Sequence, residues 1–270
     1  MRSLGLATDL LALGTAAEVE RHADRIVVRT PLEPDFWSGN VLIRLTPPDS
    51  PEREEARFRA DFPGAAHLRI EWDDPALDPE PLRAPWGGRG AEVEVDDVLT
   101  LDLARDGPPP EPLVPDGYAL RALDPARSAD WEDVLHFALT VAGEEGYSLD
   151  FHETFLRGRF AARRADAAAG RLRWWVASHG ERIVAQLGLV QGEVPGGSPG
   201  EVLGRFQAVA THPAHRRRGL CTALLAQAAR AARASRLVIV AEADAAPGRL
   251  YRRAGFRFVE RTVAVQRAGY

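Results

Sequence analysis

The chain has 270 residues, 45% of them hydrophobic and 27% charged, which excludes a disordered polymer and suits one large domain or two ordinary ones. Its formal net charge of -5 argues against general nucleic-acid binding, which needs a positive field. The single cysteine, Cys221, excludes an internal disulfide and any multi-cysteine metal site, as is usual in a reducing compartment.

The charges are unevenly distributed along the chain. Up to residue 110 there are 12 arginines against 22 acidic residues, and after it 22 arginines against 17, with no lysine anywhere. The segment RDGPPPEPLVPDG at 105–117 cannot continue a helix or a central strand. We therefore expect an acidic domain over 1–105, a proline-rich linker over 106–116 and a basic domain over 117–270.

The N-terminus, MRSLGLATDLLALGTAA, is similar in outline to a signal peptide, but Asp9 interrupts its apolar run. Its leucines suit one side of an ordinary helix. No stretch of the sequence is long and apolar enough to span a bilayer. These features predict a cytoplasmic protein without membrane attachment.

The first domain reads as a small α+β unit. Ser50, as a possible N-cap, and Pro51 mark the start of a helix that ends before Pro63 and Gly64. A segment rich in proline and glycine at 75–90 interrupts the pattern of elements. Strands rich in valine and isoleucine are expected at 25–31, 39–48, 66–72 and 98–104.

In the second domain, predicted helices and strands follow each other more regularly than in the first. We expect helices within 127–143 and 150–168, at 219–235 and at 247–255, and strands at 117–123, 171–178, 182–190, 201–211, 236–243 and 256–266. The short turn HGE favours an antiparallel hairpin, and QGEVPGGSPG at 191–200 is a loop. This order predicts a mixed α+β fold with a mostly antiparallel sheet, one parallel crossover and flanking helices.

The stretch HPAHRRRGLCTALL at 212–225 places three arginines and Gly219 directly before a helix. The first-turn N–H groups of a helix lack internal partners and, with the helix dipole, bind anions. Gly219 permits close approach of an anion to the backbone, and guanidinium groups suit phosphate oxygens. The stretch therefore predicts an anion site suited to a diphosphate, although an arginine run also occurs as a merely solvated face.

The segment VATHPAHRRRGLCTALL resembles motif A of the GNAT superfamily of N-acetyltransferases, R-x-x-G-x-[GA], with Arg216, Gly219 and Cys221 at its three defined positions. Cys221 departs from the usual glycine or alanine. LYRRAGF at 250–256 is similar to motif B, and the resemblance covers roughly 117–270. It implies a GNAT-like fold and acetyl-coenzyme A as the acyl-donor co-substrate.

By this resemblance, the strand before the arginine stretch splays from its neighbour. Its main chain would hold the pantetheine arm of the cofactor. The resemblance also makes Tyr251 the catalytic acid that protonates the departing thiolate, a role that a phenol suits; the alternative is packing against the sheet. The cofactor-binding residues so implied are Val209, Ala210, Thr211, Arg216, Arg217, Arg218, Gly219, Leu220, Cys221 and Thr222.

The general base is not evident in the sequence. Many family members carry a glutamate on the strand before motif A, where this chain has Gln207, which cannot accept a proton at neutral pH. Deprotonation is then left to solvent or to a remote group such as Glu193, Glu201 or Glu242. We expect no covalent role for Cys221, because no histidine is placed as its partner.

His212 and His215 flank the arginine stretch. With no carboxylate or cysteine at ligand spacing, we expect no metal site. Trp174 and Trp175 alternate on one strand, and we expect both in the core.

The segment PDFWSGNVLIRL at 34–45 is similar to the N-terminal partner domain of some two-domain family members, a degenerate copy of the same fold. It has no arginine-glycine loop, so we expect no coenzyme A binding there. Phe36 and Trp37 are candidates for contacts to the second domain or for core packing.

The sequence thus predicts an acyltransferase that moves an acetyl group from acetyl-coenzyme A directly to a primary amine of a small molecule or peptide. The alternative is a non-catalytic acyl-coenzyme A-binding module that senses or regulates. Substrate specificity would lie in 127–168 and 191–200, and the oligomeric state is open.

Overall fold

The computed structural model describes residues 1–144, 149–194 and 197–268. By its internal contacts the chain divides into two compact units. The first contains 1–99, 240–249 and 258–270, and the second contains 100–239 and 250–257. They differ from the contiguous ranges expected from the sequence, because the last strand of the chain pairs with a strand of the first unit.

The first unit contains a sheet in the order β1-β2-β3-β4-β11-β5. The β3–β4 pair is parallel and is connected through α2, whereas β1–β2, β2–β3 and β4–β11 are antiparallel. Its elements, in whole or in large part, are α1 (Leu4–Leu13), β1 (Glu18–Arg21), β2 (Arg25–Arg29), β3 (Val41–Arg44), α2 (Pro51–Asp61), β4 (His67–Trp72), α3 (Glu80–Gly87), β5 (Glu92–Asp102) and β11 (Arg257–Ala268).

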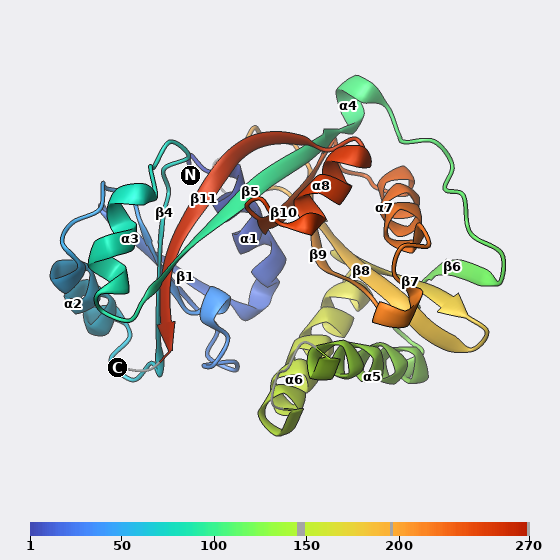
Figure 1. Cartoon of the computed structure of the whole chain (residues 1–270), viewed down its shortest axis with the longest axis horizontal. Coiled ribbons are helices and arrows are strands. Elements are labelled where there is room, and N and C mark those ends of the chain that lie inside the picture. The colour runs from blue at the N-terminus through green and yellow to red at the C-terminus, as the bar shows by residue number, and fades with distance from the viewer. Residues whose placement is uncertain (145–148, 195–196, 269–270) are drawn as a thin grey trace. The chain divides into compact units, whose positions relative to one another are not determined.

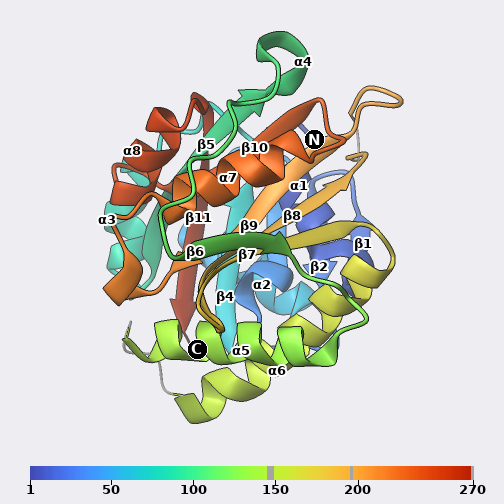
Figure 2. The same ribbon diagram turned by 90° about the vertical axis from the view of Figure 1, so that its right-hand side faces the viewer.

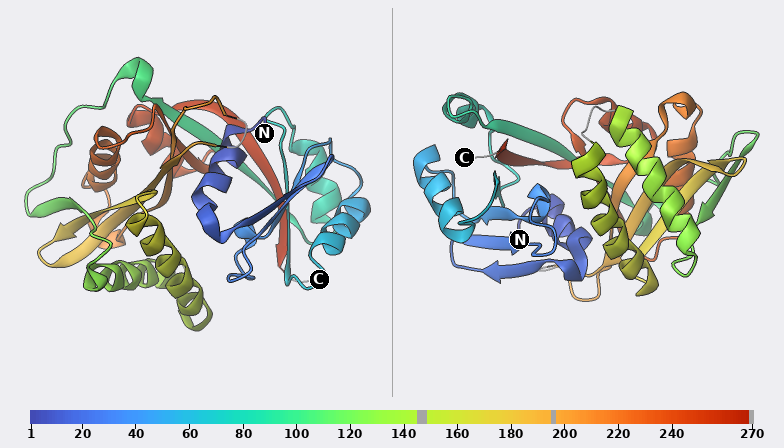
Figure 3. Two further views of the ribbon diagram at one scale, coloured as in Figure 1. Left: turned by 180° about the vertical axis from the view of Figure 1, so that it is seen from behind. Right: turned by 90° about the horizontal axis from the view of Figure 1, so that it is seen from below.

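Side chains of β2 alternate between two apolar cores, as the period of a strand requires. Val27 packs with Phe58 of α2 and Trp86 of α3, while Ile26 and Val28 pack with the leucines of α1. Figure 3 shows α1 on one face of these strands and α2 with α3 on the other. Both faces of this sheet are therefore covered.

The second unit contains the strand order β10-β9-β8-β7-β6. The β9–β10 pair is parallel and is connected through α7, whereas β6–β7, β7–β8 and β8–β9 are antiparallel. Its elements, in whole or in part, are α4 (Leu103–Asp106), β6 (Tyr118–Ala122), α5 (Ser128–Glu144), α6 (Leu149–Ala168), β7 (Leu172–His179), β8 (Arg182–Gly192), β9 (Leu203–Thr211), α7 (Leu220–Arg230), β10 (Arg236–Glu242) and α8 (Ala246–Arg253).

Helices α5 and α6 cover one face of strands β6–β9, and α7 crosses the other (Figures 1 and 2). On the α5/α6 face, Trp174 packs its ring against Trp131 and Phe160, with centroids 6.1 and 5.4 Å away. A Cβ added at Gly188 of β8 would lie 2.7 Å from the Trp174 ring, so only glycine fits there. Trp174 and Trp175 are both buried, which confirms that they belong to the core.

The predicted mixed α+β fold with a mostly antiparallel sheet and flanking helices is confirmed. Two elements of the first unit, β1 and α3, were not expected, and a third, β5, begins earlier than expected. β1 lacks apolar alternation because all four residues are exposed. α3 forms within the proline- and glycine-rich 75–90 segment because Leu82 and Trp86, one helical turn apart, are buried in the core. β5 begins at Glu92 instead of 98.

Helix α7 ends at Arg230, before the predicted end at 235. The side-chain oxygen of Gln191 accepts hydrogen bonds from the backbone N–H groups of Arg233 and Ala234, at 2.7 and 3.2 Å. These bonds satisfy two donors outside the helix and so stabilise its end. Ser50 precedes α2 as predicted, but its side chain makes no capping hydrogen bond.

Phe36 and Trp37 pack within the first unit. Phe36 contacts the apolar cluster that includes α1, and the Trp37 ring stacks on that of His67 with centroids 5.5 Å apart. Of the predicted specificity segments, residues 145–148 and 195–196 lie outside the described residues. None of the helices in the described part of the chain combines the length and apolarity that spanning a bilayer requires.

Candidate functional site

Strand β9 contains a bulge near its C-terminal end. Gln207 lies opposite Gly188 of β8, and Ala210 lies opposite Gln186, so two residues of β9 share one residue of β8. Ala208 within the bulge has a φ of 50°, in the left-handed region that non-glycine residues seldom adopt. Bulges of this kind bend a strand and are frequent beside active sites.

The bulge follows the point where β9 and β10 stop pairing. Their last pair joins Arg205 to Val238, but β9 continues through 206–211. No strand among the described residues pairs with this edge of β9 beyond Arg205, so its backbone groups are available to hydrogen-bond a ligand. Val209, Ala210 and Thr211 all lie on this segment, and each is half-buried.

The arginine stretch forms a tight connection between β9 and α7. The short 3₁₀ helix Pro213–His215 comes first. Arg217 then adopts a φ of 64°, and Gly219 a φ of 80° as the residue that precedes the helix. Left-handed conformation in a long-chain residue such as Arg217 costs free energy and is most frequent at functional sites.

The first turn of α7 is open to an anion. Gly219 has no side chain to cap the helix, the first turn contains no acidic residue, and a Cβ added at Gly219 would meet nothing within 4 Å. The Gly219 carbonyl accepts the N–H of Ala223 at 2.9 Å. The preceding N–H groups, those of Leu220, Cys221 and Thr222, therefore need a partner from outside the helix.

Two of the three arginines are available as counter-charges. The Nε of Arg216 donates to the Thr211 carbonyl at 3.1 Å and so fixes the connection to β9. The side chains of Arg217 and Arg218 are exposed, and neither forms a hydrogen bond or ion pair within the described ranges. Their positive charge adds to that of the helix N-terminus.

A cluster of aromatic and imidazole rings lies beside this connection. The Tyr118 hydroxyl is 2.9 Å from Nδ1 of His215, and the ring of His215 is 5.5 Å from that of His179 and 5.7 Å from that of His212. Burial, followed by the nearby His179, His212 and Arg218, lowers the pKa of His215, which favours its neutral form. No group of three potential ligand side chains among the described residues is placed to hold a metal ion.

Tyr251 of α8 is 7% exposed, and its ring contacts Phe256. Burial, and secondarily the nearby Cys221 thiol, raise its pKa, so the hydroxyl is protonated at neutral pH. The hydroxyl has no hydrogen-bond partner in the described ranges. A protonated phenol without an internal acceptor can donate its proton to a ligand.

Burial also raises the pKa of the Cys221 thiol, to about 12. The thiol is therefore protonated at neutral pH despite its place at a helix N-terminus. Since the thiolate is the reactive form of cysteine, this disfavours Cys221 as a nucleophile, in agreement with the sequence.

Two of the remote carboxylates proposed as the general base lie near the N-terminal end of β9, away from the bulge. Glu193 and Glu201 flank the start of the strand, and Glu201 pairs with Arg236 at 3.5 Å. At about 3.3 Å per residue, Glu201 is roughly 20 Å from the bulge. Glu242 is exposed and belongs to the first unit. Gln207 lies at the bulge itself and is half-buried.

One polar residue at the bulge, Gln186, was not predicted from the sequence. Gln186 of β8 is 4% exposed, and its side-chain oxygen has no hydrogen-bond partner in the part of the chain that the structure describes. It lies two residues from Gly188 along β8 and so shares the α5/α6 face with Trp174. Buried amides without a partner are uncommon. Only the register, which the sequence does not reveal, brings Gln186 to the bulge.

The chain is similar in sequence and in fold to known proteins. Residues 170–258 match the family model described as Acetyltransferase (GNAT) domain. No curated protein matches the chain. Solved structures resemble nearly all of it. A conserved protein of unknown function from Staphylococcus epidermidis has a TM-score of 0.70 at 12% identity, with 95% of each chain covered.

Two further structures carry descriptions of the family. A GCN5-related N-acetyltransferase from Kribbella flavida has a TM-score of 0.64 at 17% identity, covering 98% of this chain and 95% of that one. A tandem GNAT protein from the clavulanic acid biosynthesis pathway has a TM-score of 0.51 at 18% identity, covering 99% and 89%. At these identities the likeness concerns the fold.

The family match includes β7 to α8, and with them the bulge of β9, the arginine stretch, the first turn of α7 and Tyr251. Residues 170–258 are therefore similar to the acetyltransferase domain of the GNAT superfamily.

Proposed function

We propose that the protein is an N-acetyltransferase that uses acetyl-coenzyme A and transfers the acetyl group directly to a primary amine. The observation that carries the proposal is the run from the unpaired edge of β9, over the left-handed Gly219, into the acid-free first turn of α7. This run offers main-chain hydrogen bonds to an extended chain and then an anion site for a diphosphate.

The residues present fit such a ligand. Leu220, Cys221 and Thr222 would donate backbone N–H groups to the diphosphate, while Arg217 and Arg218 would neutralise part of its charge. The edge at 209–211 would bind the pantetheine arm. Bound acetyl-coenzyme A would supply the acetyl group as a thioester.

In the transfer, the amine nitrogen would form a bond to the thioester carbonyl carbon, and the carbon–sulfur bond would break. Tyr251 would give its proton to the departing thiolate and recover one from solvent, and the proton lost by the amine would pass to solvent. A carboxylate base is not required if the amine enters in its neutral form. The side-chain oxygen of Gln186, which has no hydrogen-bond partner among the described residues, is a candidate hydrogen-bond partner for the amine substrate on the α5/α6 face.

The test is calorimetric titration of acetyl-coenzyme A into the full chain, followed by a screen of primary amines for thiol release. Micromolar binding that the Gly219→Glu variant abolishes would support the proposal. Absence of binding to the unaltered protein would overturn it.

The second candidate is a non-catalytic acyl-coenzyme A sensor, favoured by Gln207 at the position where a base is often found. Tyr251→Phe separates the two, because an enzyme loses turnover while it keeps its cofactor affinity. A sensor would show no turnover with either residue at position 251, and it would keep its cofactor affinity in the variant.

A further inference from the structure

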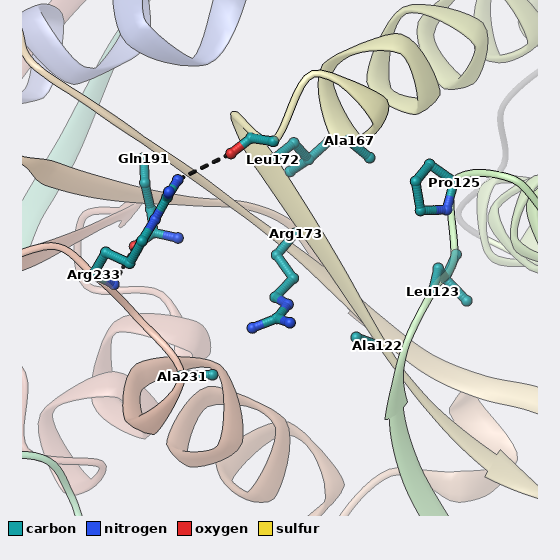
Figure 4. Close-up of a pocket in the computed structure, with 10 residues that line it drawn as sticks. Ala122, Leu123, Pro125, Ala167, Leu172, Arg173, Gln191, Ala231 and Arg233 are labelled. Atoms are coloured by element: carbon teal, nitrogen blue, oxygen red, sulfur yellow. Dashed lines mark hydrogen bonds between the residues drawn. The ribbon is translucent and has the colours of Figure 1, made fainter.

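A second cavity of the same unit lies beyond the C-terminal end of α7 and has a volume of about 400 Å³. This size is within the range of small-ligand pockets. Since α7 has 11 residues, its C-terminal end is about 16 Å from the first turn that faces the proposed diphosphate site. The cavity is therefore separate from that site. Figure 4 shows it between the end of α7, the end of α6 and the neighbouring ends of β6 and β7.

Six of the ten lining residues are apolar, namely Ala122, Leu123, Pro125, Ala167, Leu172 and Ala231, and the side chains of Arg173 and Arg233 are exposed. The polar side chains of the lining are those of Arg173, Gln191 and Arg233, and none of the lining residues is acidic.

Arg173 is the central feature of the cavity. Its side chain extends into the space from the second residue of β7 (Figure 4), and its guanidinium carbon lies 5.4 Å from the centre of the Trp175 ring. Such stacking holds a guanidinium in place without neutralising it. The side chain has no ion pair or hydrogen bond within the described ranges. The nearby carboxylate of Asp166 is bonded to Arg171 instead.

The other two polar groups also present donors. Arg233 gives one N–H to the Gly170 carbonyl at 3.0 Å, which fixes the side chain and leaves its other N–H groups available. The Gln191 oxygen is already used by the backbone N–H groups of Arg233 and Ala234, so this amide has only its NH₂ left to offer.

A cavity that combines six apolar lining residues with polar side chains that offer only hydrogen-bond donors suits an acceptor group carried on an apolar body. The ends of α6 and α7 contribute some negative potential. The bond from Arg233 to Gly170 offsets part of it, and Arg173 remains uncompensated. A carboxylate on an apolar body matches this arrangement better than inorganic phosphate, because its apolar body can also contact the six apolar lining residues.

We propose that this cavity is a binding site for a small carboxylate with a short apolar body, held by Arg173 and Arg233 at the C-terminal end of α7. The site is separate from the acyl-donor site and lies at the neighbouring ends of β6 and β7, between the ends of α6 and α7.

Benzoate is the probe, and benzamide is its uncharged counterpart of the same shape. Calorimetric titration into the full chain should give saturable benzoate binding with a Kd below about 10 mM, and binding of benzamide at least about tenfold weaker. Inorganic phosphate should not compete. Competition by phosphate would show a general anion site and would overturn the assignment to an apolar carboxylate.

Arg173→Met keeps the apolar stem over Trp175 and removes the charge, and should weaken benzoate binding about tenfold or more. Arg182→Met removes the same charge from an exposed residue at the far end of the β7–β8 hairpin, and should leave binding unchanged. Ala231→Trp fills the cavity and tests the location without altering charge. Thermal unfolding of each variant verifies that it is folded.

No saturation below 10 mM would overturn the proposal. So would binding that Arg173→Met and Ala231→Trp leave intact, which would place the probe elsewhere, for example on Arg217 and Arg218. These results do not depend on acetyl-coenzyme A binding, so the outcome is distinct from that of the proposed function.

Discussion

Substitutions at Gly219 separate backbone strain from anion binding. Gly219 has a φ of 80° and empty space where a Cβ would be. Gly219→Ala therefore meets no clash within the protein and should cost only the left-handed strain, about 1–2 kcal/mol of unfolding free energy. Gly219→Glu should pay the same strain, but its carboxylate can reach the unpartnered N–H groups of the first turn of α7 and compete with a bound anion.

The expected effect on binding follows from the donors that are lost. A hydrogen bond from a backbone N–H to a charged oxygen contributes about 1.5–3 kcal/mol. Loss of two such bonds would weaken acetyl-coenzyme A binding by roughly a hundredfold or more. Gly219→Ala should weaken it far less, because the donors remain.

The assay is calorimetric titration of acetyl-coenzyme A into the unaltered protein and both variants, with unfolding midpoints measured in parallel. Equal affinities of the alanine and glutamate variants would refute the reasoning, because the charge would then not matter at this position. Unchanged stability of Gly219→Ala would contradict the left-handed strain.

Three further substitutions test neighbouring features. Tyr251→Phe should lower kcat about a hundredfold with the acetyl-coenzyme A affinity within about twofold, measured by thiol release and calorimetry; equal turnover would exclude the phenol as the acid. Burial raises the Cys221 pKa from 9.0 to about 12, so the unfolded chain loses this proton first as the pH rises. The unfolding free energy should then fall by about 1 kcal/mol between pH 9 and pH 10 in denaturant titrations, and Cys221→Ala should lack that fall. Gln186→Met removes a buried amide without a partner and should raise the unfolding free energy by about 1 kcal/mol; a lower unfolding midpoint would show that the amide is satisfied in the folded protein.

The spacing of residues in the sequence was enough to predict most elements of the second unit. Helix and strand periods are local properties, and the glycine at the start of α7 is a local signal for a left-handed turn. The prediction that the 216–222 stretch binds an anion rests on the same local rules. Its resemblance to GNAT motif A agrees with the family match over 170–258.

Elements whose formation depends on distant partners were not predictable. α3 forms in a proline-rich stretch because Leu82 and Trp86 are buried among residues far away in the sequence. The last strand, β11, pairs with β4 by its C-terminal half, so it joins the first unit although it follows the second in the chain. Pairing between strands that are far apart in the sequence cannot be predicted from the spacing of residues.

The sequence by itself determined the acid-free, glycine-led start of α7 and the placement of three arginines before it, because these depend on neighbouring residues. Only the tertiary structure decided which groups meet there and which do not. The register of β8 and β9 brings Gln186 to the bulge and places Glu201 far from it. Packing of α6, α7 and β7 brings Arg173 and Arg233 to one cavity. Register and packing depend on the whole set of contacts, which no short stretch of sequence contains.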